Sequence, residues 1–146
     1  MSPAEITSYL HKNIPITAAM GVKVESSDAG GLVLIAPLEP NHNHLGTAFG
    51  GSLSAIATLA GYGVVWLALG DPDAHVVVGD GTLRFRRPVT KSIRAICVSP
   101  EPPVMQHFCE EFNRAGRGRL RLQVTIEEDG EVAVEFEGTF IARRQR

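Results

Sequence analysis

One charge-free stretch in the middle of the chain constrains the fold more than any other feature. Residues 41–70, NHNHLGTAFGGSLSAIATLAGYGVVWLALG, contain no Asp, Glu, Lys or Arg. From about Thr47 to Leu69 the stretch has the composition and length of a helix, and Gly70 is a typical helix stop. Because a helix that is apolar on most of its surface has to be covered, the rest of the chain must supply its packing partner.

The same stretch is long enough to cross a membrane. However, it carries several hydroxyl groups, its flanks have no basic anchor, and alternating strands follow directly. We therefore expect a helix buried within the fold, and no membrane partner. The hydroxyl groups belong to Thr47, Ser52, Ser54, Thr58 and Tyr62.

The flanking segments alternate between apolar and polar residues, which is typical of strands with one buried and one wet face. Asp129-Gly130 is a hairpin turn signal between the last two strands. The pattern predicts an antiparallel sheet wrapped around the central helix, in a single domain covering residues 1–146. The expected elements are a helix from Ser2 to about His11, two strands within 21–38 with a turn at 28–31, strands within 75–89 and 92–99, a helix over 104–116, and strands over 120–126 and 132–136.

The strand within 75–89 carries most of the charged candidates. Gly79 and Gly81 are expected to bulge it. Leu83 and Phe85 should face one side of the sheet. The opposite side should carry the polar residues Asp80, Thr82, Arg84 and Arg86.

Bulk composition excludes several classes of function. The net charge is −2, which does not favour a nucleic-acid partner. Cys97 and Cys109 do not form a disulfide framework and are expected to be reduced. The N-terminus lacks the build of a signal peptide, so we expect a cytoplasmic protein.

The start of the central helix has the features of a chemical site. The first amides of a helix have no internal partner, and the helix dipole favours negative charge there. Without Cβ atoms at Gly50 and Gly51, a ligand oxygen can approach these amides, as in an oxyanion hole. The alternative interpretation is close packing of the helix on the sheet, or a loop that needs flexible residues.

The segment NHLGTAFGGSL resembles the Asn-x-x-Gly-Thr-x-His-Gly-Gly motif of hot-dog-fold acyl-CoA thioesterases. With LRFRRPV downstream, it is most similar to the branch related to the C-terminal domain of YiiD-type proteins. The order of elements resembles that fold over nearly the whole chain. The resemblance therefore implies an α+β hot-dog fold.

The resemblance assigns two residues directly and shows two departures. Gly50 matches the glycine whose amide polarises the thioester carbonyl, and Asn43 matches the residue that orients the carbonyl or a water molecule. Phe49 stands where many relatives have histidine. Thr58 stands where the helix usually carries a carboxylate that acts as nucleophile or general base.

Asp80 is the leading candidate to replace the missing carboxylate. It could activate water if it reaches the Gly50 amide, within one chain or across a dimer interface. The alternatives are a bulge residue or an ion pair with Arg84. Thr58 can hold a water molecule but is not a base at neutral pH.

Other candidates concern substrate binding. Arg84, Arg86 and Arg87 suit the phosphates of coenzyme A, or alternatively protect a strand edge from pairing. Ser54 and Phe49 are expected to contact substrate. Phe49, Tyr62 and Trp66 are candidates for lining an acyl tunnel, although core packing is the preferred role for Trp66.

Two further chemistries are disfavoured. His42 and His44 lack the additional ligands of a zinc site, so no metal is expected. Ser52 and Ser54 lack an adjacent base and do not fit a nucleophile elbow.

The resulting hypothesis is hydrolysis of an acyl-CoA or acyl-carrier thioester, with no cofactor other than the coenzyme A of the substrate. The alternative is a non-catalytic domain that binds acyl-CoA or acyl-carrier protein. A hydratase ranks last, because no suitable histidine lies near Gly50. The resemblance also implies a homodimer or a dimer of dimers, with the site between protomers.

Overall fold

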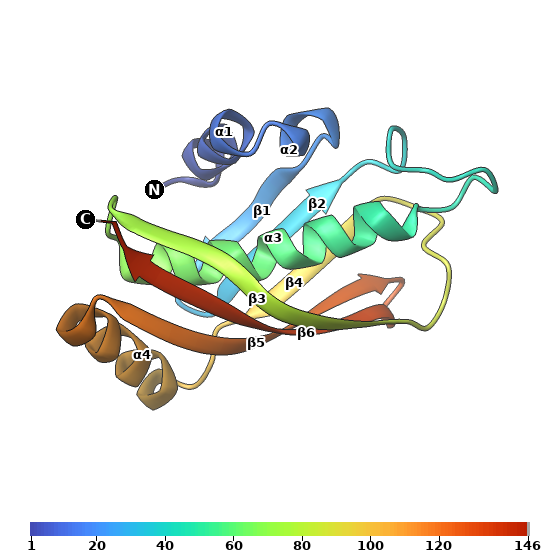
Figure 1. Cartoon of the computed structure of the whole chain (residues 1–146). Helices are drawn as coiled ribbons and strands as arrows, with labels where there is room; N and C mark the ends of the chain where they lie inside the picture. The colour runs from blue at the N-terminus through green and yellow to red at the C-terminus, as the bar shows by residue number, and fades with distance from the viewer. Residues whose placement is uncertain (146) are drawn as a thin grey trace.

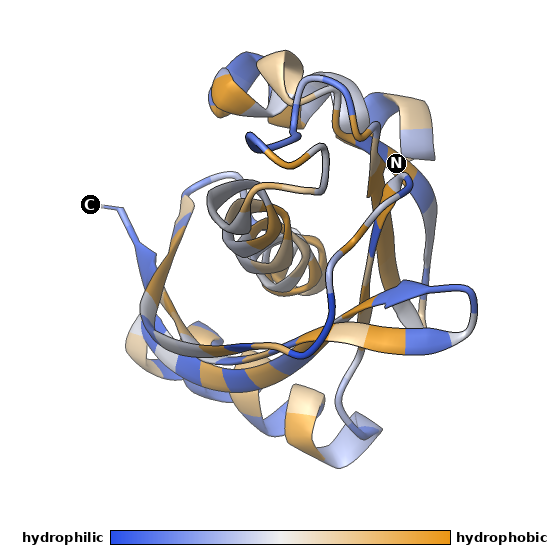
Figure 2. Cartoon of the chain, turned by 90° about the vertical axis from the view of Figure 1, so that its right-hand side faces the viewer, coloured by the Kyte–Doolittle hydropathy of each residue, from blue (hydrophilic) through white to orange (hydrophobic). Residues whose placement is uncertain are grey.

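The computed structural model describes residues 1–145 of the chain. A six-stranded antiparallel sheet, in the order β1-β2-β4-β5-β6-β3, curves around one long helix, α3 (Figure 1). Viewed along the helix, the sheet curves from the left of α3, beneath it and up its right, and the N-terminal helices lie above it (Figure 2). The predicted sheet wrapped around a central helix is therefore confirmed.

The elements follow the predicted order with one addition, the short helix α2. Their bounds are α1 (Pro3–Asn13), α2 (Ile16–Ala19), β1 (Lys23–Asp28), β2 (Gly31–Ala36), α3 (Gly50–Leu69), β3 (Ala74–Phe85), β4 (Ile93–Val98), α4 (Pro102–Ala115), β5 (Arg117–Glu128) and β6 (Glu131–Arg144). The predicted start of the long helix at Thr47 is wrong. The three residues before Gly50 belong to a loop that is held by its own hydrogen bonds.

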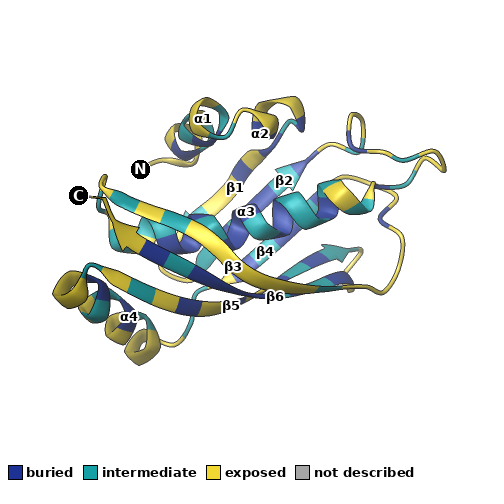
Figure 3. Cartoon of the chain, viewed as in Figure 1, coloured by how far each residue is buried: buried dark blue, intermediate teal, exposed yellow. Residues whose placement is uncertain are grey.

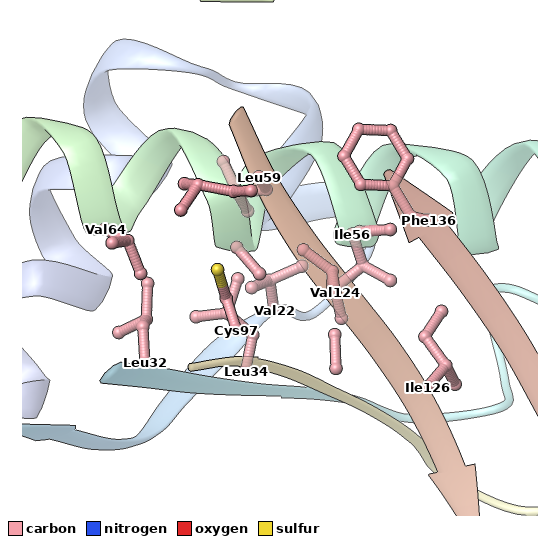
Figure 4. Close-up of a cluster of buried hydrophobic side chains, with 14 of the residues drawn as sticks. Val22, Leu32, Leu34, Ile56, Leu59, Val64, Cys97, Val124, Ile126 and Phe136 are labelled. Carbon is pink, nitrogen blue, oxygen red and sulfur yellow. The ribbon is translucent and has the colours of Figure 1, made fainter. Parts of the chain in front are cut away.

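Helix α3 forms the centre of the core. Ile56 and Val64 project from it toward the sheet, where they meet side chains of β2, β4 and β5 (Figure 4). Ile56 is fully buried, and Leu32 of β2 and Val124 of β5 are 1% exposed. By length and composition α3 could also span a membrane, but in this fold it is the core helix beneath the sheet.

Glycines within α3 make room for large neighbouring side chains. A Cβ atom added at Gly61 would lie 2.3 Å from the ring of Phe140 on β6, and one at Gly63 would lie 2.4 Å from Leu32. Both distances are far inside van der Waals contact. The small residues of this helix therefore admit side chains of the sheet to the helix axis.

A bulge at Gly79 sets which face of the sheet each β3 residue occupies. The pairing of β3 with β6 shifts between Val78 and Asp80, so the predicted bulge at Gly79 is confirmed. The predicted bulge at Gly81 is wrong, because Gly81 pairs with Gly138 in regular register.

After the bulge, Leu83 and Phe85 pair with Phe136 and Val134 of the buried row. Asp80 pairs with Thr139, which is the partner of Arg121 on β5. Because Arg121 lies between Leu120 and Leu122, which face α3, this row faces away from α3. Asp80 therefore lies on the outer face of the sheet.

The last hairpin and α4 complete the sheet. Asp129 and Gly130 both have positive φ values, 53° and 77°, so the predicted turn is confirmed. Helix α4 packs against β5 with Phe108 and Phe112 buried, while most of its other residues face solvent (Figure 3).

We predict that Gly61→Ala destabilises the protein although alanine is the better helix former. The new methyl group overpacks against Phe140, and overpacking costs about 1–3 kcal/mol, more than the gain in helix propensity of about 1 kcal/mol. Denaturant unfolding measures the change. The double variant Gly61→Ala/Phe140→Leu should be less destabilised than the sum of the single variants. A Gly61→Ala protein more stable than wild type would contradict this packing.

Candidate functional site

The first turn of α3 is open to an incoming acceptor. The first backbone bond that closes into the helix runs from the Leu53 amide to the Phe49 carbonyl at 3.1 Å, so the amides of residues 50–52 precede it. Within residues 1–145, no side chain caps these amides and the first turn carries no acidic residue. The positive end of the helix dipole is therefore available to an oxygen atom.

The two adjacent glycines at this end have different surroundings. A Cβ atom at Gly51 would lie 2.3 Å from the ring of Phe49, which folds back over the helix. A Cβ atom at Gly50 would meet nothing closer than the ring of Phe85, at 3.8 Å. Packing therefore explains the glycine at 51, whereas packing does not require the glycine at 50.

Two exposed aromatic side chains flank the helix start. Phe49 is 55% exposed and Phe85, at the end of β3, is 54% exposed. Large apolar side chains that are half exposed on both sides of open amides are typical of a binding site.

Asn43 organises the loop that leads into α3. Its Oδ1 atom accepts bonds from the amides of Leu45 (2.8 Å) and Thr47 (3.2 Å), and its Nδ2 atom donates to the Thr47 hydroxyl (2.9 Å). The backbone amide of Asn43 also donates to the backbone carbonyl of Thr47 at 2.7 Å. The side chain thus holds the loop, and one Nδ2 hydrogen remains for a ligand.

A second asparagine anchors the same loop to the core. Asn41 is 2% exposed, and its Nδ2 atom donates to the carbonyls of Met20 and Pro37, both at 2.8 Å. Its carbonyl accepts from the Phe49 amide at 2.7 Å. Asn41 therefore fixes both the loop and the residue that begins the helix.

An open groove of 610 Å³ begins at the first turn of α3 and continues along the helix. It extends from Gly51 to Tyr62, which is about 16 Å of helix. One wall is the segment from the end of α1 to α2, and the other is β3. The lining residues are Ile14, Ile16, Thr17, Met20, Gly51, Ser54, Ala55, Thr58, Leu59, Tyr62, Val76, Val77, Val78 and Phe140.

Three hydroxyl-bearing residues of α3, Ser54, Thr58 and Tyr62, line this groove. Ser54 donates from its hydroxyl to the Gly50 carbonyl at 3.0 Å. Thr58 lies one turn further on, and the Tyr62 hydroxyl is 3.2 Å from that of Tyr9. Burial, and then the contact with Tyr9, raises the pKa of Tyr62 above its ordinary value, so this hydroxyl stays neutral.

Asp80 does not lie in this groove within one chain. Its carboxylate is 3.6 Å from Arg121 on the outer face of the sheet, and Arg121 also pairs with Glu137. The ion pair expected with Arg84 is replaced by this contact with Arg121. A role for Asp80 at the Gly50 amide would require a second chain and stays a prediction.

The arginine cluster near the end of β3 is exposed and partly paired. Arg86 forms an ion pair with Glu135, and Arg87 with Glu131. Arg84 lies in the same outward row as Asp80. The loop that follows Arg87 contacts the helix-start loop, because the Ala48 amide donates to the Val89 carbonyl at 2.8 Å. The cluster therefore lies beside the site rather than in the groove.

The structure brings together Phe49, Gly50, Gly51, Ser54 and Thr58, with Asn43 in the adjoining loop. It leaves Asp80 and Arg84 on the outer face of β3, and Arg86 and Arg87 in the segment directly after β3. The sequence interpretation missed Asn41 and the wall formed by residues 14–20. An asparagine directly after Pro40 was one available signal for the loop anchor, whereas nothing local marked α2 as a wall of the groove.

Comparisons with known proteins agree with this architecture. A family model described as "Putative thioesterase (yiiD_Cterm)" matches residues 3–144. A protein of unknown function from Chlorobaculum tepidum has a crystal structure that superposes on this chain with a TM-score of 0.89. The two sequences are 32% identical, and the match covers 99% of this chain and 98% of that one. The chain has the hot-dog fold.

Two further crystal structures carry functional descriptions. A "putative thioesterase" from Shewanella oneidensis is 28% identical with a TM-score of 0.82, covering 97% of this chain and 96% of that one. A "Probable Thioesterase" from Pseudomonas aeruginosa is 26% identical with a TM-score of 0.80, covering 98% and 97%.

We predict that Asn43→Ala lowers the melting temperature, because three side-chain hydrogen bonds of the loop are lost and each contributes about 1 kcal/mol. Asn43→Asp should keep a melting temperature near that of wild type. Its carboxylate still accepts from the Leu45 and Thr47 amides, and the Thr47 hydroxyl can donate to it. Calorimetry of the three proteins tests the assignment. Equal destabilisation by both substitutions would contradict the loop-holding role.

Proposed function

The chain belongs to the "Putative thioesterase (yiiD_Cterm)" family, and from this premise we propose that it hydrolyses acyl thioesters at the start of α3. The observation that carries this proposal is the uncapped first turn of α3, which opens directly into an apolar groove. A thioester has a carbonyl oxygen that suits the amides and an acyl chain that suits the groove.

In the proposed complex, the carbonyl oxygen accepts a hydrogen bond from the Gly50 amide. Negative charge develops on this oxygen as water adds to the carbonyl carbon, and the dipole of α3 favours that charge more than it favours the neutral carbonyl. The absence of a Cβ atom at Gly50 leaves the approach open. Removing one such donor typically costs on the order of a hundredfold or more in kcat.

The two ends of the substrate are proposed to lie on opposite sides of the helix start. The acyl chain follows the groove beside Ser54 and Thr58. The thiol carrier leaves past Phe49 and Phe85 toward Arg87, where coenzyme A would place its phosphates. The carrier is coenzyme A or an acyl-carrier protein, and no other cofactor is needed, because water is the only other reactant.

The proposed reaction breaks the carbon–sulfur bond and forms a carbon–oxygen bond to water. One proton of the water is lost to solvent or a base, and the leaving thiolate takes up a proton to give the free thiol. Thr58 lies eight residues after Gly50, about 12 Å along the helix, so within one chain its hydroxyl lies beside the acyl chain rather than beside the carbonyl. Asp80 serves as the base only if a partner chain brings a carboxylate to the site.

A specific observation also favours a second candidate, a non-catalytic acyl-CoA or acyl-carrier binder. Among the described groove residues, Tyr62 is the one titratable side chain, and its hydroxyl stays neutral. The groove itself therefore supplies no carboxylate or imidazole base. Binding without release of thiol would favour this candidate.

We predict that the purified protein releases thiol from acyl-CoA, and that Gly50→Ala lowers kcat/KM at least tenfold without loss of stability. The added methyl group has space in the free protein but obstructs the carbonyl. A thiol-reactive dye measures release, and melting temperature measures stability. Unchanged activity in Gly50→Ala would contradict the proposed position of the carbonyl.

Asp80→Ala tests the base in the same assay. Asp73→Ala is the matched control, because it also removes an exposed carboxylate but lies in the turn before β3. A selective loss of kcat in Asp80→Ala would support Asp80 as the base. Equal activity in the two variants would exclude it.

We also propose that the protein is a homodimer that pairs through β3. This strand is at the edge of the sheet and is 12 residues long, and Val77 and Val78 on it are 59% and 42% exposed. The half of β3 before the bulge is therefore an apolar edge that is available for strand pairing. Two-fold pairing of β3 would also give the groove a wall from the partner.

We predict that the wild-type protein gives a mass in sedimentation equilibrium of twice the 15.7 kDa of one chain. Val77→Lys should shift the equilibrium toward the monomer, because a charged side chain on an edge opposes pairing. Val77→Thr is the uncharged, β-branched control and should remain dimeric. A wild-type protein that sediments only as a monomer would contradict the shared site.

A further inference from the structure

We propose that Tyr62, held in place by Tyr9, forms the closed end of the groove and limits the length of the acyl chain that the protein accepts. This inference rests on the proposed function, because it takes the acyl chain to start at Gly50. It assigns a role in specificity to the contact between α1 and α3.

Tyr62 has the right position for an end wall. It is the last α3 residue that lines the groove, eleven residues after Gly51 and on the same side of the helix as Ser54 and Thr58. Its ring is half-buried, and its hydroxyl lies 3.2 Å from the hydroxyl of Tyr9. The hydroxyl contact therefore ties the Tyr62 ring to α1.

The next turn of α3 is also covered by Tyr9. Trp66 follows Tyr62 by four residues and lies on the same stripe of the helix. The rings of Tyr9 and Trp66 stack with centroids 4.0 Å apart and planes inclined by 17°. Tyr9 thus contacts both aromatic residues, and the three rings fill the path that a longer chain would take.

The length of the open part suggests which chains fit. Gly51 and Tyr62 are separated by about 16 Å along the helix axis. An extended chain advances roughly 1.2 Å per bond, so roughly twelve carbons fit between the helix start and the Tyr62 ring. The substrate class that follows is medium-chain acyl thioesters.

The experiment measures kcat/KM over saturated acyl-CoA substrates of graded length for wild type, Tyr62→Ala and Tyr62→Phe. Wild type should rise with chain length up to roughly twelve carbons and then fall. Tyr62→Ala should continue to rise, by about fourfold for each further methylene that it buries. Tyr62→Phe keeps the ring but loses the hydroxyl contact with Tyr9, so it should keep the maximum at roughly twelve carbons with a less steep fall beyond it. If Tyr62→Ala does not fold, Tyr62→Leu replaces it.

Affinity for non-hydrolysable acyl-CoA thioethers of the same lengths provides a readout independent of turnover. A shift of the affinity profile in Tyr62→Ala supports the length limit even if no protein releases thiol, in which case the proposed hydrolysis fails alone. Release of thiol by wild type with the same length profile in Tyr62→Ala overturns the length limit alone. Affinities that do not depend on chain length in wild type also overturn it.

Discussion

Burial of α3 against the concave face of the sheet is the interaction on which the rest of the structure depends. The helix carries no charge along its length, so nearly every side of it would be unfavourable in water. Ile56 and Val64 meet the strands, and the glycines at 61 and 63 bring Phe140 and Leu32 close to the helix axis. The sheet covers most of the helix, and the side that it leaves toward the β3 edge becomes the groove.

The start of the helix shows how one residue type can serve two demands. Gly51 gives room to the Phe49 ring, which is a packing demand within the chain. Gly50 has open space around the missing Cβ, so the protein gives up helix propensity there without a packing return. A site that binds an oxygen through backbone amides explains this choice, because a side chain would restrict the approach.

Periodicity was sufficient to predict the helix in a wrapped sheet, because alternation along the strands reports burial directly. It could not place the start of α3, since the loop before the helix is held by three side-chain hydrogen bonds of Asn43, which the apolar pattern does not report. It grouped Asp80 correctly with Thr82 and Arg84, but could not say which face they share. The face is set by pairing across the sheet, which aligns Asp80 with Thr139 and Arg121, and Arg121 is distant from Asp80 in sequence.

The uncharged groove limits how such a site can accelerate a reaction. Its described polar groups are hydroxyls, and Tyr62 is kept neutral by burial, so no group inside it changes charge near neutral pH. Acceleration from this side must come from orienting water and from amides whose dipoles are fixed before the substrate arrives. Any pH dependence of turnover near neutrality would therefore have to come from outside the groove: from hydroxide, from the leaving thiol, or from a residue elsewhere in this chain or in a partner chain.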